Sequence, residues 1–246
     1  IDNTEPGIVK QTEGSSSTSL LIVEDNAEIR QYIRDSLSSA CEILEACNGK
    51  EGVEMAIERI PDIIISDIMM PVMDGINLCR ILKEDVRTCH IPIILLTAKD
   101  SLVDKIEGYS TGADSYITKP FNSGLLQSRI KNLIEGKEKV KEFFSSNIYK
   151  KMITTDALCE LDHRFMEKTT SLIEEKMESD QLNAMFLPEQ HCMSYSAFSR
   201  KIKAVTGMTA HELIRKLKPR RAEQMLPSRE YLIREIPTRL GFHNLR

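Results

Sequence analysis

Five side chains that could carry out phosphoryl or metal chemistry stand at the ends of apolar segments of this sequence. They are Glu24, Asp25, Asp67, Thr97 and Lys119. Clustered carboxylates repel one another unless a cation compensates, and Mg²⁺ accepts carboxylates, water and phosphate oxygens. With such a metal bound, Asp67 could attack a phosphoryl group as a carboxylate nucleophile, while Thr97 and Lys119 hold the other oxygens. Asp67 by itself could equally cap the next element.

The apolar segments that must position these side chains are typical of buried parallel strands. We expect strands at residues 20–23, 63–66, 91–96 and 114–118. Helical periodicity lies between them, for example at Ile29, Ile33 and Leu37. Strands that alternate with helices form right-handed crossovers and a parallel sheet, so their carboxyl ends share one edge. Because ligands bind at that edge in open α/β sheets, we predict that the five side chains converge on one site.

Residues 19–136 resemble a response-regulator receiver domain. The matching residues are Glu24-Asp25, Asp67, Thr97, Tyr116, Lys119-Pro120 and the loop Met70-Pro71-Val72-Met73-Asp74-Gly75. The resemblance implies an α/β flavodoxin-like fold whose five-stranded parallel sheet has the order 2-1-3-4-5. It also implies that Asp67 is the phosphoacceptor for a histidine kinase.

The same resemblance implies a role for each site residue. Mg²⁺ would be held by Asp25, Asp67 and the main-chain carbonyl of Met69, and Glu24 would act through a metal-bound water. Thr97 and Tyr116 would be the switch pair, in which the hydroxyl moves toward the phosphate and the ring turns inward behind it. Without its position three residues before Lys119, Tyr116 would be interpreted as a half-buried strand aromatic.

An aspartyl phosphate also forms in haloacid-dehalogenase-type phosphatases, which are enzymes proper. That chemistry needs a second Asp two residues after the nucleophile, as general acid. Here the position holds Met69, which cannot transfer a proton. The sequence therefore favours a receiver that is not itself an enzyme beyond its own phosphorylation and dephosphorylation.

Length and composition agree with a two-domain protein. The chain has 246 residues, and 41% of them are hydrophobic. No apolar run approaches the roughly 18–20 residues of a membrane helix, and no secretory segment opens the chain. The six cysteines are scattered without a C-x-x-C pair, which favours reduced thiols in a cytoplasmic setting. We therefore expect no membrane contact by this chain, although a longer parent protein could be membrane-anchored.

Two segments are expected to connect folded parts. Residues 1–18 are polar and rich in Ser, which predicts a flexible linker. Because the chain begins at Ile1, we expect a longer parent protein, and a linker ahead of a receiver resembles hybrid sensors that carry the kinase upstream. A deliberately trimmed chain would look the same. Residues 137–159 are expected to form a helical connector, either a solvated spacer or a dimerising element.

The last segment carries the opposite charge from the rest. Residues 199–246 contain twelve Lys or Arg and four Glu, a formal charge of +8; because the whole chain carries −4, the remainder carries −12. A basic module on an acidic carrier suggests binding to nucleic acid. A charge run is usually only a solvated face, so the pattern within it must decide.

A helix after the N-cap Ser194 is expected to have two distinct faces. Its spacing buries Phe198, Ile202 and Val205, and Thr206-Gly207 ends it. Thr209 and Glu212 form a capping box for the next helix. The opposite face suits the major groove of duplex DNA. The candidate DNA contacts are Tyr195, Ser196, Ser199, Arg200 and Lys203.

Residues 160–246 resemble the all-α DNA-binding domain of AraC-type regulators, which contain two helix-turn-helix units joined by a long helix. The matching residues are Met193-Ser194, Arg200-Lys201-Ile202-Lys203, Thr206-Gly207, Glu212-Leu213-Ile214-Arg215, Arg221-Ala222, Ile236 and Gly241-Phe242. An opening helix near residues 162–177 also fits.

Three departures from the AraC pattern are visible. Pro188 and Pro237 stand where helices of the family usually have Ala, and a proline inside a helix costs about 3 kcal/mol. Cys192 stands where a positive φ usually requires Gly. The chain ends at Arg246, before the second recognition helix, so the domain is incomplete at its C-terminus.

These patterns predict a phosphorylation-controlled transcription regulator, the C-terminal part of a hybrid two-component sensor. Its partners would be a histidine kinase, duplex DNA and a second copy on phosphorylation, because paired modules bind repeated half-sites more tightly. The alternative is a phosphorelay or protein-interaction receiver whose C-terminal module does not bind DNA. A steep salt dependence of binding to duplex DNA would separate the two.

Overall fold

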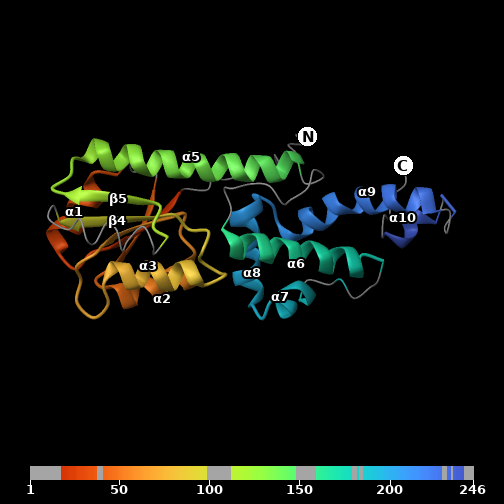
Figure 1. The fold of residues 1–246 in the computed structure, drawn as a ribbon, viewed down its shortest axis with the longest axis horizontal. Helices are drawn as coiled ribbons and strands as arrows, with labels where there is room; N and C mark the ends of the chain where they lie inside the picture. The colour runs from red at the N-terminus through yellow and green to blue at the C-terminus, as the bar shows by residue number, and fades with distance from the viewer. Residues whose placement is uncertain are drawn as a thin grey trace, which may run out of the picture.

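The computed structural model describes residues 18–37, 41–98, 112–147, 159–178, 182, 185–228, 232–233 and 235–240. An α/β part is followed by an all-helical part, and the two lie side by side along the long axis of the molecule (Figure 1). Most of the expected linker, residues 1–17, lies outside the described residues, as do Gly241 and Phe242.

The α/β part is built on one parallel sheet. Its strands are β1 (Ser19–Val23), β2 (Glu42–Ala46), β3 (Ile63–Asp67), β4 (Ile93–Ala98) and β5 (Ser115–Lys119). Their order is β2-β1-β3-β4-β5, and every neighbouring pair is parallel, which confirms the predicted fold class. The four strands expected from the apolar segments are present. Strand β2 was not located from its sequence, because it lies at the edge of the sheet and its residues are mostly half-buried.

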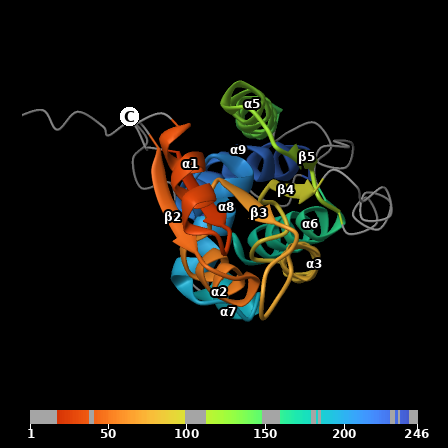
Figure 2. The ribbon, with the colours of Figure 1, turned by 90° about the vertical axis from the view of Figure 1, so that its left-hand side faces the viewer.

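Four helices among the described residues cover the two faces of the sheet. They are α1 (Ala27–Asp35), α2 (Gly49–Arg59), α3 (Gly75–Glu84) and α5 (Ser123–Asn147). Figure 2 shows α2 and α3 below the sheet and α5 above it. Successive strand residues point to opposite faces, so Leu21 and Val23 pack with α2 and α3, whereas Leu20 and Ile22 pack with α1 and α5. Burial on both faces explains the nearly continuous apolar segments of β1, β3 and β4.

The C-terminal part consists of helices packed around one apolar core. They are α6 (Glu160–Lys176), α7 (Phe186–Gln190), α8 (Tyr195–Thr206), α9 (Ala210–Ser228) and α10 (Ile236–Arg239). Phe198, Ile202 and Val205 of α8 are buried in this core, as predicted. No helix within the described residues is long and apolar enough to span a membrane.

The predicted ends of α8 and the start of α9 are confirmed. Ser194 Oγ accepts a hydrogen bond from the Ala197 amide at 3.2 Å, and Gly207 ends the helix at φ +72°. Glu212 accepts a bond from the Thr209 amide at 2.8 Å, and Thr209 Oγ1 accepts one from the Glu212 amide at 3.2 Å. This reciprocal pair is the expected capping box.

The prediction that Pro188 and Pro237 destabilise their helices is wrong. Pro188 is the third residue of α7 and Pro237 the second of α10, so both stand in a first turn. Amides there have no partner within the helix, so a residue without an N–H group loses no hydrogen bond. Cys192 does have the expected positive φ, +53°.

Helix α5 connects the two parts. Leu126 and Ile130 in its first half pack against the sheet, whereas Val140 packs against the core of the helical part. The segment predicted as a connector therefore continues the helix of the α/β part as far as Asn147. The rest of that segment up to residue 158 lies outside the described residues.

Candidate functional site

The predicted chemical residues meet at the carboxyl edge of the sheet. Glu24 and Asp25 follow β1, Asp67 ends β3 and Lys119 ends β5. Lys119 Nζ lies 2.8 Å from Glu24 Oε2 and 3.0 Å from Asp67 Oδ1. One ammonium thus joins acids from two neighbouring strands, because the parallel arrangement brings their ends together.

The three acids form a set of oxygen donors of the kind that a hard divalent cation prefers. Oxygen atoms of Glu24, Asp25 and Asp67 lie within 4.8 Å of one another. Glu24 and Asp67 are buried, whereas Asp25 is exposed, so the set is open to solvent on one side. This donor chemistry fits Mg²⁺, which binds one or two carboxylates and keeps several waters.

The charge of Glu24 depends on its two neighbours. Burial raises the pKa of Glu24, the hydrogen bond from Lys119 opposes this, and the nearby Asp67 raises it further; the net shift is upward. A cation bound between the acids would favour the ionised carboxylates for the same reason that Lys119 does.

Two residues that were not singled out in the sequence hold the acidic loop in place. Arg30 donates to the main-chain oxygens of Glu24 at 2.6 Å and Asp25 at 3.1 Å. The side chain of Asn26 caps α1 by accepting from the amides of residues 28 and 29. The sequence signal for this arrangement is Asn26, a typical N-cap residue directly after the acidic pair. The position of Arg30 within the helix gives no comparable signal of its contact with the loop.

The loop after Asp67 folds tightly against the end of β3. The Gly75 amide donates to the Ile68 oxygen at 2.9 Å, and a Cβ atom on Gly75 would lie only 2.1 Å from the Asp67 main-chain oxygen. Asp74 caps α3 by accepting from the Asn77 amide at 2.6 Å. Met69 lies in this loop with its side chain exposed. The residue at position 75 must therefore be Gly to let the loop return to the end of β3.

The expected switch residues lie on adjacent strands. Thr97 of β4 is buried, and its hydroxyl donates to the Ala98 oxygen at 3.3 Å. Tyr116 of β5 pairs with Leu95, and its ring packs against the core under α2 and α3 with the hydroxyl oxygen buried. The ring therefore occupies an inward position in this structure.

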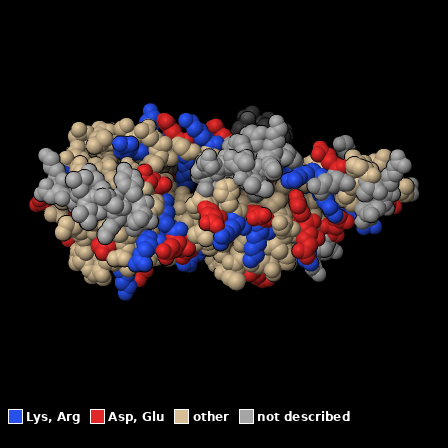
Figure 3. All heavy atoms as spheres, viewed as in Figure 1, with Lys and Arg blue, Asp and Glu red and all other residues tan. Residues whose placement is uncertain are grey.

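The residues expected to contact DNA lie mostly on the outer face of α8. Tyr195, Ser196, Arg200 and Lys203 are exposed, and Ser199 is half-buried. On the face shown in Figure 3, basic and acidic side chains are interspersed over the helical part. Lys201 was not singled out in the sequence as a buried residue, although its spacing three residues after Phe198 places it on the buried face of α8; it is fully buried and pairs with Asp162 of α6.

Comparisons with known proteins match both parts of the chain to signalling proteins. Residues 20–131 match the family described as Response regulator receiver domain. The protein named Histidine kinase P4, from Formosa agariphila, is 38% identical over 233 residues, which are 94% of this chain but 17% of that protein. The Probable transcriptional regulator ycf27 of Cyanidium caldarium is 32% identical over 205 residues, which cover 79% of this chain and 78% of that protein.

Among solved structures, the chain is similar to the signal receiver domain of a signal transduction histidine kinase from Syntrophus aciditrophicus. It is 34% identical, with a TM-score of 0.46, and the match covers 56% of this chain and 98% of that one. This chain spans only 17% of the length of Histidine kinase P4 and 52% of the length of the DNA-binding dual master transcriptional regulator RpaA of Synechocystis.

Proposed function

This chain belongs to the response regulator receiver domain family through residues 20–131, and we propose that Asp67 accepts a phosphoryl group from a histidine kinase. The observation that carries the proposal is the contact of Lys119 with both Glu24 and Asp67, beside the exposed Asp25. A carboxylate nucleophile, a cation for the phosphoryl oxygens and a set of metal ligands are what this transfer requires.

Each site residue has a distinct task in the proposed transfer. Asp67 attacks phosphorus, the bond to the kinase histidine breaks, and Lys119 and Thr97 bind the oxygens of the transferred group. Asp25, Asp67 and the carbonyl of Met69 would hold Mg²⁺, and Glu24 would act through a metal-bound water. When bound, the metal supplies charge compensation for the acids and the phosphoryl oxygens.

Phosphorylation would be transmitted by Thr97 and Tyr116. These two residues lie on β4 and β5, and the buried Tyr116 hydroxyl matches the inward position expected of the switched state. Movement of the Thr97 hydroxyl toward the phosphate would stabilise that position. The change would then reach the helical part through α5, which packs on both.

The helical part is proposed to be an AraC-type module that binds duplex DNA and pairs with a second copy of the chain on phosphorylation. The whole chain is proposed to be a cytoplasmic, C-terminal part of a hybrid two-component sensor. Support comes from the caps of α8, its exposed polar face, and the alignment of 94% of the chain with a histidine kinase. Tyr195, Ser196, Ser199, Arg200 and Lys203 would make the contacts. A phosphorelay receiver without DNA binding is the second candidate, favoured by the interspersed charges of Figure 3.

Labelling by acetyl phosphate in the presence of Mg²⁺ tests the acceptor. We expect wild-type protein to take up a label that hydroxylamine removes, and Asp67→Asn to lose it entirely while its circular dichroism spectrum is unchanged. The control Asp35→Asn, a carboxylate at the other end of α1, should label normally. Labelling of Asp67→Asn, or a label that resists hydroxylamine, would show that another residue is the acceptor.

Binding to duplex DNA tests the output. With beryllofluoride as phosphoryl mimic, we expect binding to tighten and to weaken steeply with salt. The Arg200→Ala/Lys203→Ala variant should lower the log–log salt slope by about 0.9 for each phosphate contact that it removes. Lys131→Ala, an exposed lysine of α5, is the matched control and should leave the slope unchanged. No measurable binding by any of the three proteins, or equal slopes for all of them, would favour the relay candidate.

A further inference from the structure

We propose that Cys89 and Cys159 form a peroxide-oxidisable thiol pair whose disulfide would fasten the α/β part to the helical part. Cys89 lies between α3 and β4, and Cys159 directly precedes α6. Although 70 positions separate them in the sequence, their sulfur atoms lie within 4.8 Å of each other. A bond between them would join two parts of the molecule that are otherwise connected through α5 and the segment after it. The inference is independent of the proposed function.

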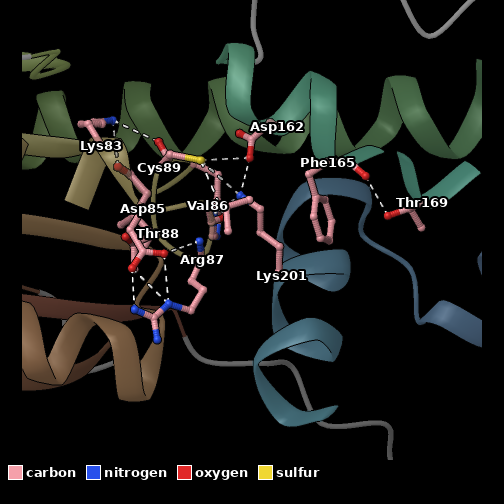
Figure 4. A network of polar contacts seen from close by, with 12 residues as sticks. Lys83, Asp85, Val86, Arg87, Thr88, Cys89, Asp162, Phe165, Thr169 and Lys201 are labelled. Carbon is pink, nitrogen blue, oxygen red and sulfur yellow. Dashed lines mark hydrogen bonds and ion pairs between the residues drawn. The ribbon is translucent and has the colours of Figure 1, made fainter. Parts of the chain in front are cut away.

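Charged groups surround the sulfur of Cys89 (Figure 4). Its thiol donates to Asp162 Oδ1 at 3.3 Å, and Lys201 Nζ lies 3.5 Å from the same sulfur. Lys201 also pairs with Asp162 and donates to Nδ1 of His90 at 3.0 Å. The carboxylate can therefore accept the thiol proton while the sulfur reacts, and the ammonium can stabilise the negative charge that develops on the sulfur.

A small oxidant can reach both thiols. A cavity of about 320 Å³ lies between the two parts, and both cysteines line it together with His90 and Lys137. Cys159 is exposed, whereas Cys89 is almost completely buried. The exposed thiol is therefore the one that meets the oxidant first, and the buried one is positioned to react second.

The pKa values of the two thiols also differ in the direction that is needed for Cys159 to react first. The hydrogen bond between them lowers the pKa of Cys159, and the same bond together with burial raises the pKa of Cys89. Because the thiolate is the nucleophile, Cys159 is the more reactive sulfur at neutral pH.

The reaction balances with one molecule of hydrogen peroxide. The Cys159 thiolate attacks one peroxide oxygen, the O–O bond breaks, and the other oxygen leaves as water after taking up a proton, so Cys159 becomes a sulfenic acid. The Cys89 sulfur, whose proton passes to Asp162, then attacks the Cys159 sulfur and expels the second oxygen as water. Two thiols lose two electrons and two protons, and peroxide is reduced to two waters.

Oxidation of the full chain with hydrogen peroxide, followed by alkylation and non-reducing peptide mass spectrometry, tests the pair. We expect a peptide that joins Cys89 to Cys159 within one chain, lighter by two hydrogen atoms than its two parts and cleaved by dithiothreitol. Cys159→Ser should abolish it, and Cys89→Ser should leave a sulfenic acid on Cys159 that dimedone traps. The oxidised wild-type protein should also unfold at a higher temperature than the reduced one, a shift that Cys159→Ser lacks.

Cys192→Ser provides the matched control, because Cys192 is an exposed cysteine of the helical part outside this cluster, and it should retain the linked peptide. The inference is overturned if Cys47 or Cys192 is oxidised while Cys89 and Cys159 stay reduced, or if the link forms only between two chains. It is also overturned if the purified protein holds a zinc ion on Cys89, Cys159 and Asp162 that protects both thiols from peroxide.

Discussion

At the scale of single residues, the carboxyl edge of the sheet depends on how a few charges are placed. Lys119 offsets the repulsion between Glu24 and Asp67, and burial makes that repulsion strong because charges interact more in a low-dielectric surrounding. Arg30 holds the main-chain oxygens of the acidic loop. The Asp67 carboxylate is therefore held by Lys119 of β5, and the acidic loop beside it is held by Arg30 of α1.

His191 is a second residue whose charge is set by its surroundings. Its ring lies 4.5 Å from the ring of Phe165 and 5.5 Å from that of Phe198, measured between centroids. Nε2 lies 3.0 Å from Thr169 Oγ1, and because this hydroxyl donates to the Phe165 oxygen, Nε2 carries the proton and donates to it. Burial, followed by the charge of Lys168, lowers the pKa of His191 from 6.5 to about 4.

This lowered pKa predicts acid sensitivity of the helical part. Between pH 6.5 and 4 the unfolded chain binds a proton at His191 that the folded chain does not, so this contribution to stability is complete above pH 6.5 and falls toward pH 4. The full shift corresponds to about 3 kcal/mol, and because the ring is only half-buried, solvent screening keeps the loss below that figure. Urea unfolding at pH 7 and pH 4.5 measures it. The free energy of unfolding should differ less between the two pH values in His191→Gln than in wild type or in the control His211→Gln. An equal difference in all three proteins would contradict the assignment of this pH dependence to His191.

At the scale of elements, the sequence signals were strongest where a cap or a buried face dictates the structure. The caps at Ser194 and Thr209 define α8 and the start of α9, since a side-chain oxygen that satisfies an end amide acts locally. By contrast, the sequence did not predict β2, because the residues of this edge strand are mostly half-buried and form no continuous apolar run. The effect of the prolines in α7 and α10 was wrongly predicted, because the sequence did not locate the start of either helix to within one turn.

At the scale of the whole molecule, the carboxyl edge of the sheet that carries Asp67 and the helical part lie at opposite ends of the strands. Strand β5 points away from the helical part in Figure 1, and all five strands are parallel, so Asp67 faces outward. The helical part instead contacts the opposite edge, where His90 meets Lys201. A kinase could therefore reach Asp67 without displacing the helical part.

The buried pair of Lys201 and Asp162 should contribute to the stability of this arrangement. Removing one member leaves the other charge buried, so Lys201→Met should lower the free energy of unfolding by about 3–5 kcal/mol. Lys201→Met/Asp162→Leu should recover most of that loss, because neither charge then remains. Lys203→Met, an exposed neighbour on the same helix, should change stability by less than about 0.5 kcal/mol. Denaturant unfolding measures all three, and additive losses in the double variant would contradict the pairing.

The residue order by itself determined four of the five strands, the convergence of Glu24, Asp25, Asp67 and Lys119, and the two faces of α8, because apolar runs, helical spacing and caps are local properties of the chain. Edge strand β2 has no comparable local signal, because its residues are mostly half-buried. Only the tertiary structure decided which partner compensates the basic residue on the buried face of α8. Lys201 meets Asp162 of α6 there, whereas Arg200 and Lys203 are exposed. The nearness of Cys89 to Cys159 is likewise tertiary, since contacts between residues so distant in the chain arise from how whole elements pack rather than from any local pattern.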